Sequence, residues 1–289
     1  MAPSSLFAIE FIKTSRAVSF WVSLGIFALF SSFVLWFSFH GTTVVNGEEI
    51  SKMLLPRDWG RLLSQFKGLQ IIFVPISLIL LTASEFTFKT ARQNVIDGLS
   101  KESFLTSKLL TTLTLTLLYL LLTLVLGMLF NLGATQKESA ETASAFITSK
   151  ELFLFAAYLL ALLGYALLGL FFAFLTRSAG SAIAFYILYL VLEGLAGGLL
   201  QFSSTLKPIV KFFPTKVFDD LVNSYRFDAE SLAQFQSQLK QAEEMGQTIP
   251  DTIYAQLPQF ETEVAFLITA LYIALIGGAT YLLFKQRDL

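Results

Sequence analysis

Long apolar stretches without charged side chains constrain this 289-residue chain more than any other feature. A helix needs about 20 apolar residues to cross the roughly 30 Å hydrocarbon core of a bilayer. Six stretches qualify, and the second, which is the shortest, can be extended by the preceding sequence RLLSQFKG. We therefore predict an all-α integral membrane domain, a single unit over 1–289, with six transmembrane helices near 18–39, 66–84, 109–132, 152–175, 179–200 and 264–284.

Composition excludes several classes of function. Hydrophobic residues make up 55% of the chain and charged residues only 14%, against about 25% in soluble domains. The formal net charge of −1 provides no field that would attract nucleic acid. The chain has no cysteine and a single histidine, His40, which excludes a thiolate or multi-histidine metal centre.

Motifs for catalysis and nucleotide binding are also missing from the sequence. No G-x-x-x-x-G-K-[ST] phosphate-binding loop occurs, and neither H-E-x-x-H nor G-x-S-x-G is present. We therefore expect no enzyme active site, and no cofactor bound by this chain itself.

The distribution of Lys and Arg predicts the orientation in the membrane. With six spans, both termini lie on one side, together with residues 85–108 and Arg177. That side holds nine of the 20 basic residues in roughly 50 positions, and the other eleven spread over roughly 100 positions. Because cytoplasmic loops are enriched in Lys and Arg, we expect both termini to be cytoplasmic. As a separate expectation, we assign the chain to the cytoplasmic (inner) membrane of a bacterium.

Two segments outside the spans have helical patterns. Residues 3–16 form an amphipathic pattern typical of a helix on the inner membrane surface, although an extension of the first span fits equally well. The longest outer segment, 207–263, lies between spans five and six and carries a stripe of apolar residues at helical spacing: Leu232, Phe235, Leu239 and Ala242. We expect this stripe to pack on the rest of the outer segment, and a partner-binding role is the alternative.

Residues 85–108 form a polar insert between the second and third spans, on the cytoplasmic side. Apolar side chains recur through it at near-helical intervals, which is not typical of a disordered loop. Gly98 can end one short helix, Ser100 can cap the next, and Lys108 can extend to the membrane interface. A folded elbow of this kind provides a docking surface for another protein, or alternatively packs only on its own bundle.

The insert resembles the cytoplasmic loop of ABC-2 type permeases, the membrane subunits of ATP-binding-cassette exporters. That family has an acid after the second span, then Gly-Thr, several mostly apolar positions, Pro-x-Ser-Arg, and Gly- or Ser-Lys before the third span. The corresponding positions here are Glu85, Lys89-Thr90, Gly98-Leu99-Ser100-Lys101 and Ser107-Lys108. Lys89 replaces the family's Gly, Gly98 its Pro, and Lys101 its Arg.

The resemblance extends over the whole chain, since the family also has six spans, an amphipathic N-terminal helix and its longest outer segment before the last span. It implies a permease that pairs with a second copy or a sister permease, surrounded by membrane lipid. Two separate ATPase subunits, which bind ATP and Mg, would dock on the insert. The residues that the resemblance implies for coupling and docking are Glu85, Thr90, Arg92, Gly98, Ser100, Lys101 and Lys108.

Glu193 is the one formal charge inside a predicted span. Ionisable groups at such positions usually face the bundle interior or a water-filled cavity. Gly194 and Gly198 follow it as a G-x-x-x-G face, which permits close helix packing or a bend at an outer gate. We therefore expect these three residues to lie at a cavity or gate, and an ordinary packing helix is the alternative.

The leading interpretation is the permease subunit of an ABC exporter. A non-transporting membrane scaffold or mechanical transmitter with the same fold is the second interpretation, and an intramembrane enzyme is the third. Lipid, peptide, antibiotic, ion and glycan cargos all fit the sequence.

Overall fold

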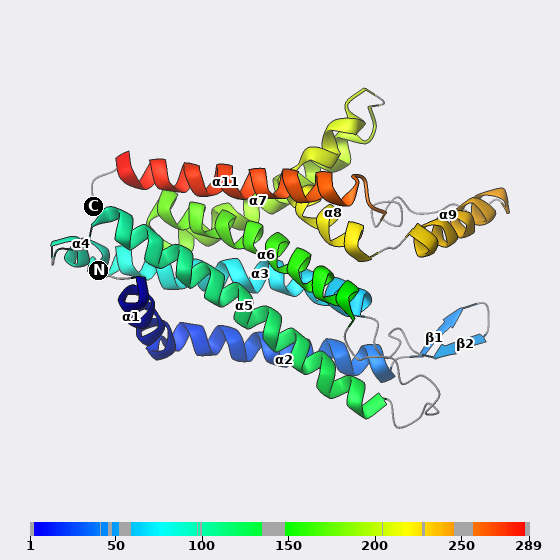
Figure 1. Cartoon of the computed structure of the whole chain (residues 1–289), viewed down its shortest axis with the longest axis horizontal. Coiled ribbons are helices and arrows are strands. Elements are labelled where there is room, and N and C mark those ends of the chain that lie inside the picture. Colours follow the sequence, from blue (N-terminus) through cyan, green and yellow to red (C-terminus); the bar gives the residue numbers. More distant parts are fainter. Residues whose placement is uncertain are drawn as a thin grey trace.

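Six helices of the computed structural model are long and apolar enough to cross a membrane, which confirms the six-span prediction. The structure describes residues 3–40, 42–45, 48–51, 59–96, 98, 100–134, 148–203, 205–226, 229–245 and 257–286. The six helices are α2 (Val18–His40), α3 (Trp59–Thr87), α5 (Lys101–Ala134), α6 (Ser149–Thr176), α7 (Ala179–Leu200) and α11 (Thr262–Gln286). They follow the long axis of the molecule as one bundle (Figure 1).

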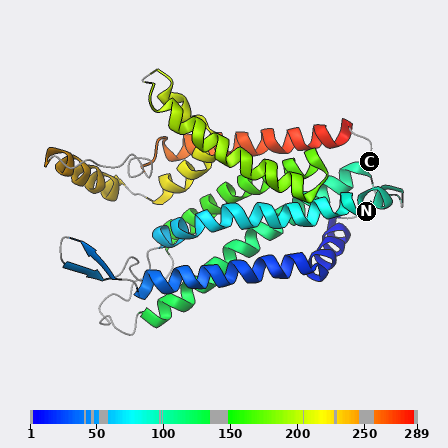
Figure 2. The ribbon, with the colours of Figure 1, turned by 180° about the vertical axis from the view of Figure 1, so that it is seen from behind.

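Shorter elements lie at the two ends of this bundle (Figures 1 and 2). The end that holds both termini, here called the terminal end, carries α1 (Pro3–Arg16) and α4 (Thr90–Ile96). The opposite end, here called the distal end, carries the hairpin of β1 (Thr42–Val45) and β2 (Glu48–Ser51), and the helix α9 (Ala229–Glu244). Both termini lie at one end because the number of spans is even.

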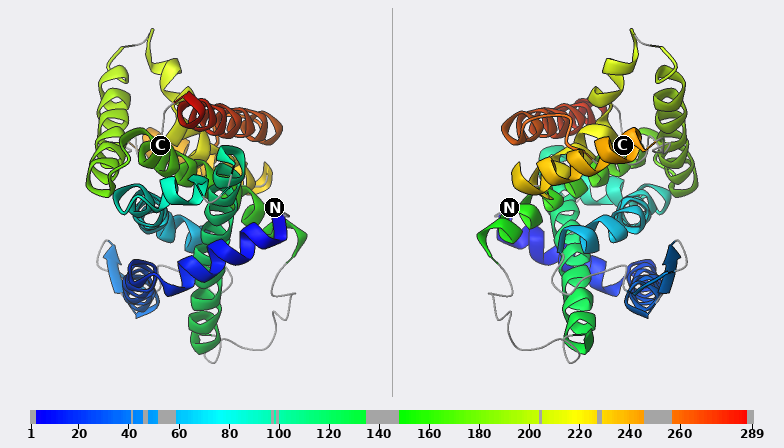
Figure 3. Two further views of the ribbon diagram at one scale, coloured as in Figure 1. Left: turned by 90° about the vertical axis from the view of Figure 1, so that its left-hand side faces the viewer. Right: turned by 90° about the vertical axis from the view of Figure 1, so that its right-hand side faces the viewer.

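Helix α1 lies across the terminal end of the bundle and is separated from α2 at Ala17 (Figure 3). It is therefore a separate helix and not an extension of the first span. Its polar residue Glu10 is buried against the bundle, while Ile9, Phe11 and Ile12 are exposed. This arrangement suits a helix whose outer surroundings are hydrocarbon, because its apolar side chains point away from the protein.

Helix α6 forms the centre of the bundle, and a larger share of it is buried than of any other candidate span. Two of its glycines permit close approach of neighbouring elements. A Cβ atom at Gly164 would meet the ring of Phe218 at 2.6 Å, and one at Gly169 would meet Cβ of Pro75 at 2.7 Å. Side chains at these positions would push α8 and α3 away from α6.

The chain turns back toward the bundle after α7. A 3-10 helix, η2 (Lys207–Phe212), leads into α8 (Pro214–Arg226), which packs against α6 and α11. The apolar face of α8 is buried and consists of Val217, Phe218, Leu221 and Val222. The first part of the predicted outer segment is thus packed into the bundle, whereas α9 projects beyond it (Figure 1).

The β-hairpin at the distal end is an element that the sequence analysis did not anticipate. Its strands pair antiparallel, with Thr42 opposite Ser51 and Val45 opposite Glu48. The sequence RLLSQFKG extends the second span, as expected, because α3 is one continuous helix from Trp59.

Candidate functional site

A buried lysine joins three elements at the terminal end. Lys108, near the start of α5, is 2% exposed, and its Nζ lies 2.8 Å from Oε2 of Glu10 on α1. The same Nζ lies 2.7 Å from Oε1 of Glu85 at the end of α3. One ammonium group therefore ties the ends of two spans to the N-terminal helix.

Hydroxyl groups complete this cluster, which we call the terminal junction (Glu10, Lys13, Glu85, Ser107, Lys108 and Thr111). Ser107 Oγ donates to Glu10 at 3.1 Å and Thr111 Oγ1 donates at 3.2 Å. Lys13 Nζ lies 3.5 Å from Glu85 and 3.6 Å from Glu10. A polar cavity of about 410 Å³ adjoins the junction and extends to Thr90 and Gln93 of α4.

The charges of the terminal junction are balanced, with two carboxylates and two ammonium groups. Burial by itself raises the pKa of the Glu10 carboxyl, but Lys108, Lys13 and the Ser107 hydroxyl together outweigh burial, and the pKa lies below its ordinary value. Glu10 is therefore ionised at neutral pH. Carboxylates and ammonium groups that are buried together are stable only as a paired set.

The sequence analysis expected Lys108 to extend to the membrane interface, and this expectation was wrong. Its aliphatic stem does not carry the ammonium group outward, because Glu10 and Glu85 already provide two acceptors within the bundle. The signal that could have revealed this was Glu10 itself, an acid on the polar face of residues 3–16 that has to find a buried cation.

Helix α4 projects from the terminal end beside the junction (Figure 1). The hydroxyl of Thr90 at its first position donates to the backbone oxygen of Glu85 at 3.2 Å. Its solvent side carries an exposed Arg92, flanked by Phe88 at 75% and Ile96 at 73% exposure. Two large apolar side chains beside a cation thus form a surface patch, here called the α4 patch.

The backbone on either side of α4 adopts left-handed conformations. Lys89 precedes the helix with φ 59°, and Gly98 follows it with φ 98°. A positive φ is unfavourable for a residue with a side chain and favourable for glycine. At Lys89 the ABC-2 pattern has glycine, which suits this geometry, whereas the proline of that pattern could not adopt the φ of Gly98.

The remaining predicted residues of the insert begin α5. The backbone N–H of Ser103 donates to Oγ of Ser100 at 3.1 Å, which is the contact of an N-terminal cap. Lys101 is the first residue of α5 and is half-buried. The structure therefore brings Glu85, Thr90 and Lys108 together, while Arg92 and Gly98 lie on the exposed surface.

Glu193 is buried at the distal half of α7, where it holds the start of α8. Its Oε1 accepts a hydrogen bond from the backbone N–H of Thr215 at 2.9 Å and from the Thr215 hydroxyl at 2.7 Å. A carboxylate at this place satisfies a backbone donor of the first helical turn. Gly194 and Gly198 lie on the exposed face of α7, with no atom within 4 Å of a Cβ built on either residue.

Two further acids of α8 were missed by sequence reasoning. Asp219 Oδ1 lies 2.9 Å from Lys67 Nζ on α3 and accepts a hydrogen bond of 2.9 Å from the Tyr165 hydroxyl on α6. Asp220 accepts the backbone N–H groups of Gln259 at 2.5 Å and Phe260 at 3.0 Å, just before α11. We call the Asp220 contacts, together with the Glu193–Thr215 contact, the α8 anchor.

Comparison with known proteins gives no family for this chain, since no protein-family model and no curated protein matches the sequence. Within the described ranges, no group of three or more His, Cys, Asp or Glu residues is placed to hold a metal ion.

Proposed function

We propose that this chain is the permease subunit of an ABC exporter, and that ATPase subunits dock on the α4 patch. The observation that carries the proposal is the position of this patch. It lies at the end of a bundle of six membrane-crossing helices, and it exposes Phe88, Arg92 and Ile96. Exposed large apolar groups beside a charged group are typical of a protein-binding surface.

The terminal junction gives the docking surface a mechanical connection to the spans. Thr90 of α4 contacts the backbone at Glu85, and Glu85 pairs with Lys108 of α5. Lys108 in turn holds α1 through Glu10. A force applied to α4 therefore acts on α3, α5 and α1 together, which is the property that a coupling element requires.

The remaining parts of the proposal follow from the ABC-2 resemblance. Two ATPase subunits supply the ATP and Mg sites, and the transport pathway forms with a second copy or a sister permease. Both termini and α4 face the cytoplasm of a bacterial cell. The open face of α7 at Gly194 and Gly198 is the proposed gate or partner contact, with Glu193 just before it.

The decisive experiment tests whether the ATPase associates with this chain through the α4 patch. The chain and its ATPase partner are co-expressed and reconstituted in vesicles. Co-purification of the ATPase and ATP hydrolysis are then measured for the parent and for Ile96→Asp. The matched control is Met245→Asp, because Met245 at the end of α9 is also 73% exposed but lies at the distal end. We expect Ile96→Asp to lose ATPase association, while Met245→Asp retains it.

Two results distinguish the competing interpretations. A partner ATPase that binds equally well to both variants would contradict docking on the α4 patch. Binding that depends on Ile96 but is never accompanied by cargo movement would favour the mechanical transmitter over the exporter.

A further inference from the structure

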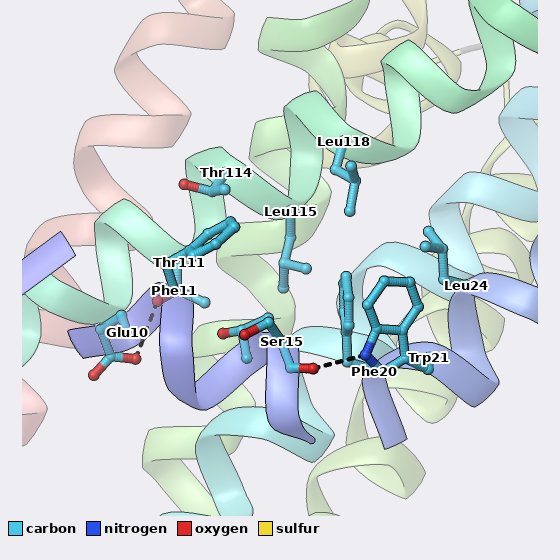
Figure 4. Close-up of a pocket in the computed structure, with 11 residues that line it drawn as sticks. Glu10, Phe11, Ser15, Phe20, Trp21, Leu24, Thr111, Thr114, Leu115 and Leu118 are labelled. Carbon is cyan, nitrogen blue, oxygen red and sulfur yellow. Dashed lines mark hydrogen bonds between the residues drawn. The ribbon is translucent and has the colours of Figure 1, made fainter. Parts of the chain in front are cut away.

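An apolar cleft opens beside α1 and adjoins the polar cavity, with which it shares the lining residues Glu10, Thr14 and Thr111. It has a volume of about 280 Å³ and is formed by α1, α2 and α5 (Figure 4). The side chains that define it are Phe11 and Ser15 of α1, Trp21 and Leu24 of α2, and Leu115 and Leu118 of α5. In Figure 4, Leu115 and Leu118 point from α5 toward Trp21 and Leu24, and α1 closes the edge nearest the terminal end.

The Ser15 and Thr114 hydroxyls and the Trp21 indole N–H each have a partner within the protein, and most of the surface of the cleft is apolar. Ser15 Oγ donates to the Ile12 oxygen at 3.1 Å, and Thr114 Oγ1 donates to the Leu110 oxygen at 2.8 Å. Trp21 Nε1 donates to the Ser15 oxygen at 2.7 Å. A water molecule in a cavity needs two to four polar partners. This lining therefore favours an apolar occupant.

The position of the cleft indicates that its mouth opens to the hydrocarbon of the bilayer. Two of its walls belong to α2 and α5, which are candidate membrane spans, and the side chains next to it are exposed apolar groups, including Phe11 and Trp21. The indole of Trp21, with one polar atom bonded to α1, is typical of a residue at the boundary between headgroups and acyl chains. Bilayer hydrocarbon is thus the medium at the mouth of the cleft.

Charge at the surface of the cleft complements a phospholipid. The last turn of α1 carries Arg16, which directly follows the cleft residue Ser15 in the sequence, whereas Lys13 is already paired with Glu10 and Glu85. Cations at this height attract the phosphate that all glycerophospholipids carry. The volume lies just below the about 300–1,000 Å³ of ordinary ligand pockets, which suits one acyl chain better than a bulky molecule.

We propose that the cleft binds one acyl chain of a glycerophospholipid from the leaflet on the terminal side, as a resident lipid that is not cargo. The chain fills the space between α1 and α5 that side chains leave open. It supports α1 on its apolar side, while Lys108 and Ser107 hold Glu10 on its polar side. This site depends on the membrane-spanning architecture and is independent of the proposed exporter function.

Cleft-filling variants test the proposal. The protein is reconstituted in vesicles of palmitoyl-oleoyl phosphatidylcholine and phosphatidylglycerol, re-extracted into mild detergent, and analysed by native mass spectrometry. We expect the parent to retain a single phospholipid, and Leu118→Trp and Leu24→Trp to lose retention roughly tenfold, equivalent to about 1.4 kcal/mol of binding. The control is Leu117→Trp, which adds the same volume on the exposed side of α5.

A second measurement avoids changes in the cleft. In a Trp36→Phe, Trp59→Phe background, Trp21 is the only tryptophan. After extraction from vesicles of phosphatidylcholine brominated on an acyl chain, we expect the fluorescence of Trp21 to remain quenched. Full recovery of fluorescence would overturn the proposal. Equal retention in the filled and control variants, a parent without phospholipid, or a retained molecule of another class would also overturn it.

Discussion

The two ends of the bundle bury carboxylates in different ways. In the terminal junction, Glu10 and Glu85 share the ammonium group of Lys108. In the α8 anchor, Glu193 and Asp220 accept hydrogen bonds from backbone N–H groups, with the Thr215 hydroxyl as a further donor to Glu193. The first arrangement joins side chains from three helices, whereas the second fixes the starting points of α8 and of the segment before α11.

This difference predicts that substitutions at the two ends will lower the stability of the fold by different amounts. A carboxylate that is paired with a buried cation becomes an uncompensated charge when the cation is removed. A carboxylate that accepts backbone N–H groups can be replaced by a neutral acceptor at lower cost, since the donors keep a partner. The terminal junction should therefore respond strongly to the loss of charge, and the α8 anchor should respond mainly to changes in packing and shape.

The largest effect is expected for Lys108→Met. Removing this cation leaves the buried Glu10 and Glu85 with only the more distant and more exposed Lys13, at a cost of about 3–5 kcal/mol in the free energy of unfolding. Unfolding in mixed detergent micelles, followed by tryptophan fluorescence, measures the change.

Two variants check that the loss arises from unpaired charge. Lys285→Met removes an exposed cation at the end of α11 and should cost little. Adding Glu10→Gln and Glu85→Gln to Lys108→Met should restore most of the stability, because no buried charge is then left unpaired. A triple variant as unstable as Lys108→Met would show that the cost has another origin.

The next largest effect is expected for Gly164→Ala, where α6 packs against Phe218 of α8. The new methyl group would meet the Phe218 ring at 2.6 Å, and overpacking of this kind costs about 1–3 kcal/mol. The control Gly194→Ala adds the same methyl group to α7, where no atom lies within 4 Å. Equal unfolding free energies for the two variants would contradict the close packing of α8 on α6.

Sequence patterns could predict the spans but not the position of α8. The spans are readable because long charge-free segments have few alternatives in a membrane. Helix α8 was assigned to the outer segment because residues 207–263 lie between spans five and six. Asp219 is half-buried beside Lys67, and Asp220 is buried because the backbone of Gln259 and Phe260 provides its partners. These partners lie far away in the sequence.

The partners of the candidate-site residues could not be predicted from the sequence either. The sequence pointed to both Glu85 and Lys108, but it did not reveal that they form an ion pair or that Glu10 completes it. The β-hairpin, by contrast, had a local signal that was overlooked. Its strands are separated by Asn46 and Gly47, a dipeptide that favours tight hairpin connections.

A smaller effect is expected for Glu193→Gln. Glutamine retains an acceptor for Thr215 but removes the negative charge at the start of α8, which is worth about 0.3–1 kcal/mol. The control is Glu244→Gln at the exposed end of α9. If transport is lost although the unfolding free energy changes this little, Glu193 has the proposed gate role. A fully active variant would leave it only the role of holding α8.

Lowering the pH should change the free energy of unfolding in opposite directions at the two ends of the bundle. The pKa of Glu10 is lowered in the folded protein, so its stabilising contribution is complete above the ordinary glutamate pKa and is lost as the pH falls below that value. Burial raises the pKa of Asp220 above its ordinary value, although Gln259 and Phe260 donate to it. Protonation of Asp220 therefore favours the folded state, and its contribution to the free energy of unfolding rises as the pH falls toward the ordinary aspartate pKa.

The measurement compares unfolding free energies across pH with Glu10→Gln and Asp220→Asn. The deficit of Glu10→Gln relative to the parent should shrink as the pH falls below the ordinary glutamate pKa. The parent should gain stability relative to Asp220→Asn on mild acidification. Parallel pH profiles for all three proteins would contradict the assignment of these charges.

Photocrosslinking in living cells from position 88 tests most directly whether the terminal end docks an ATPase. Benzoyl-phenylalanine replaces Phe88 in the α4 patch, or Phe202 beyond α7 as an exposed control. We predict that the adduct from position 88 contains a subunit with a phosphate-binding loop, identified by mass spectrometry, and that the control yields none. Absence of this subunit from the adduct at position 88, or its equal capture from position 202, would contradict docking at the terminal end.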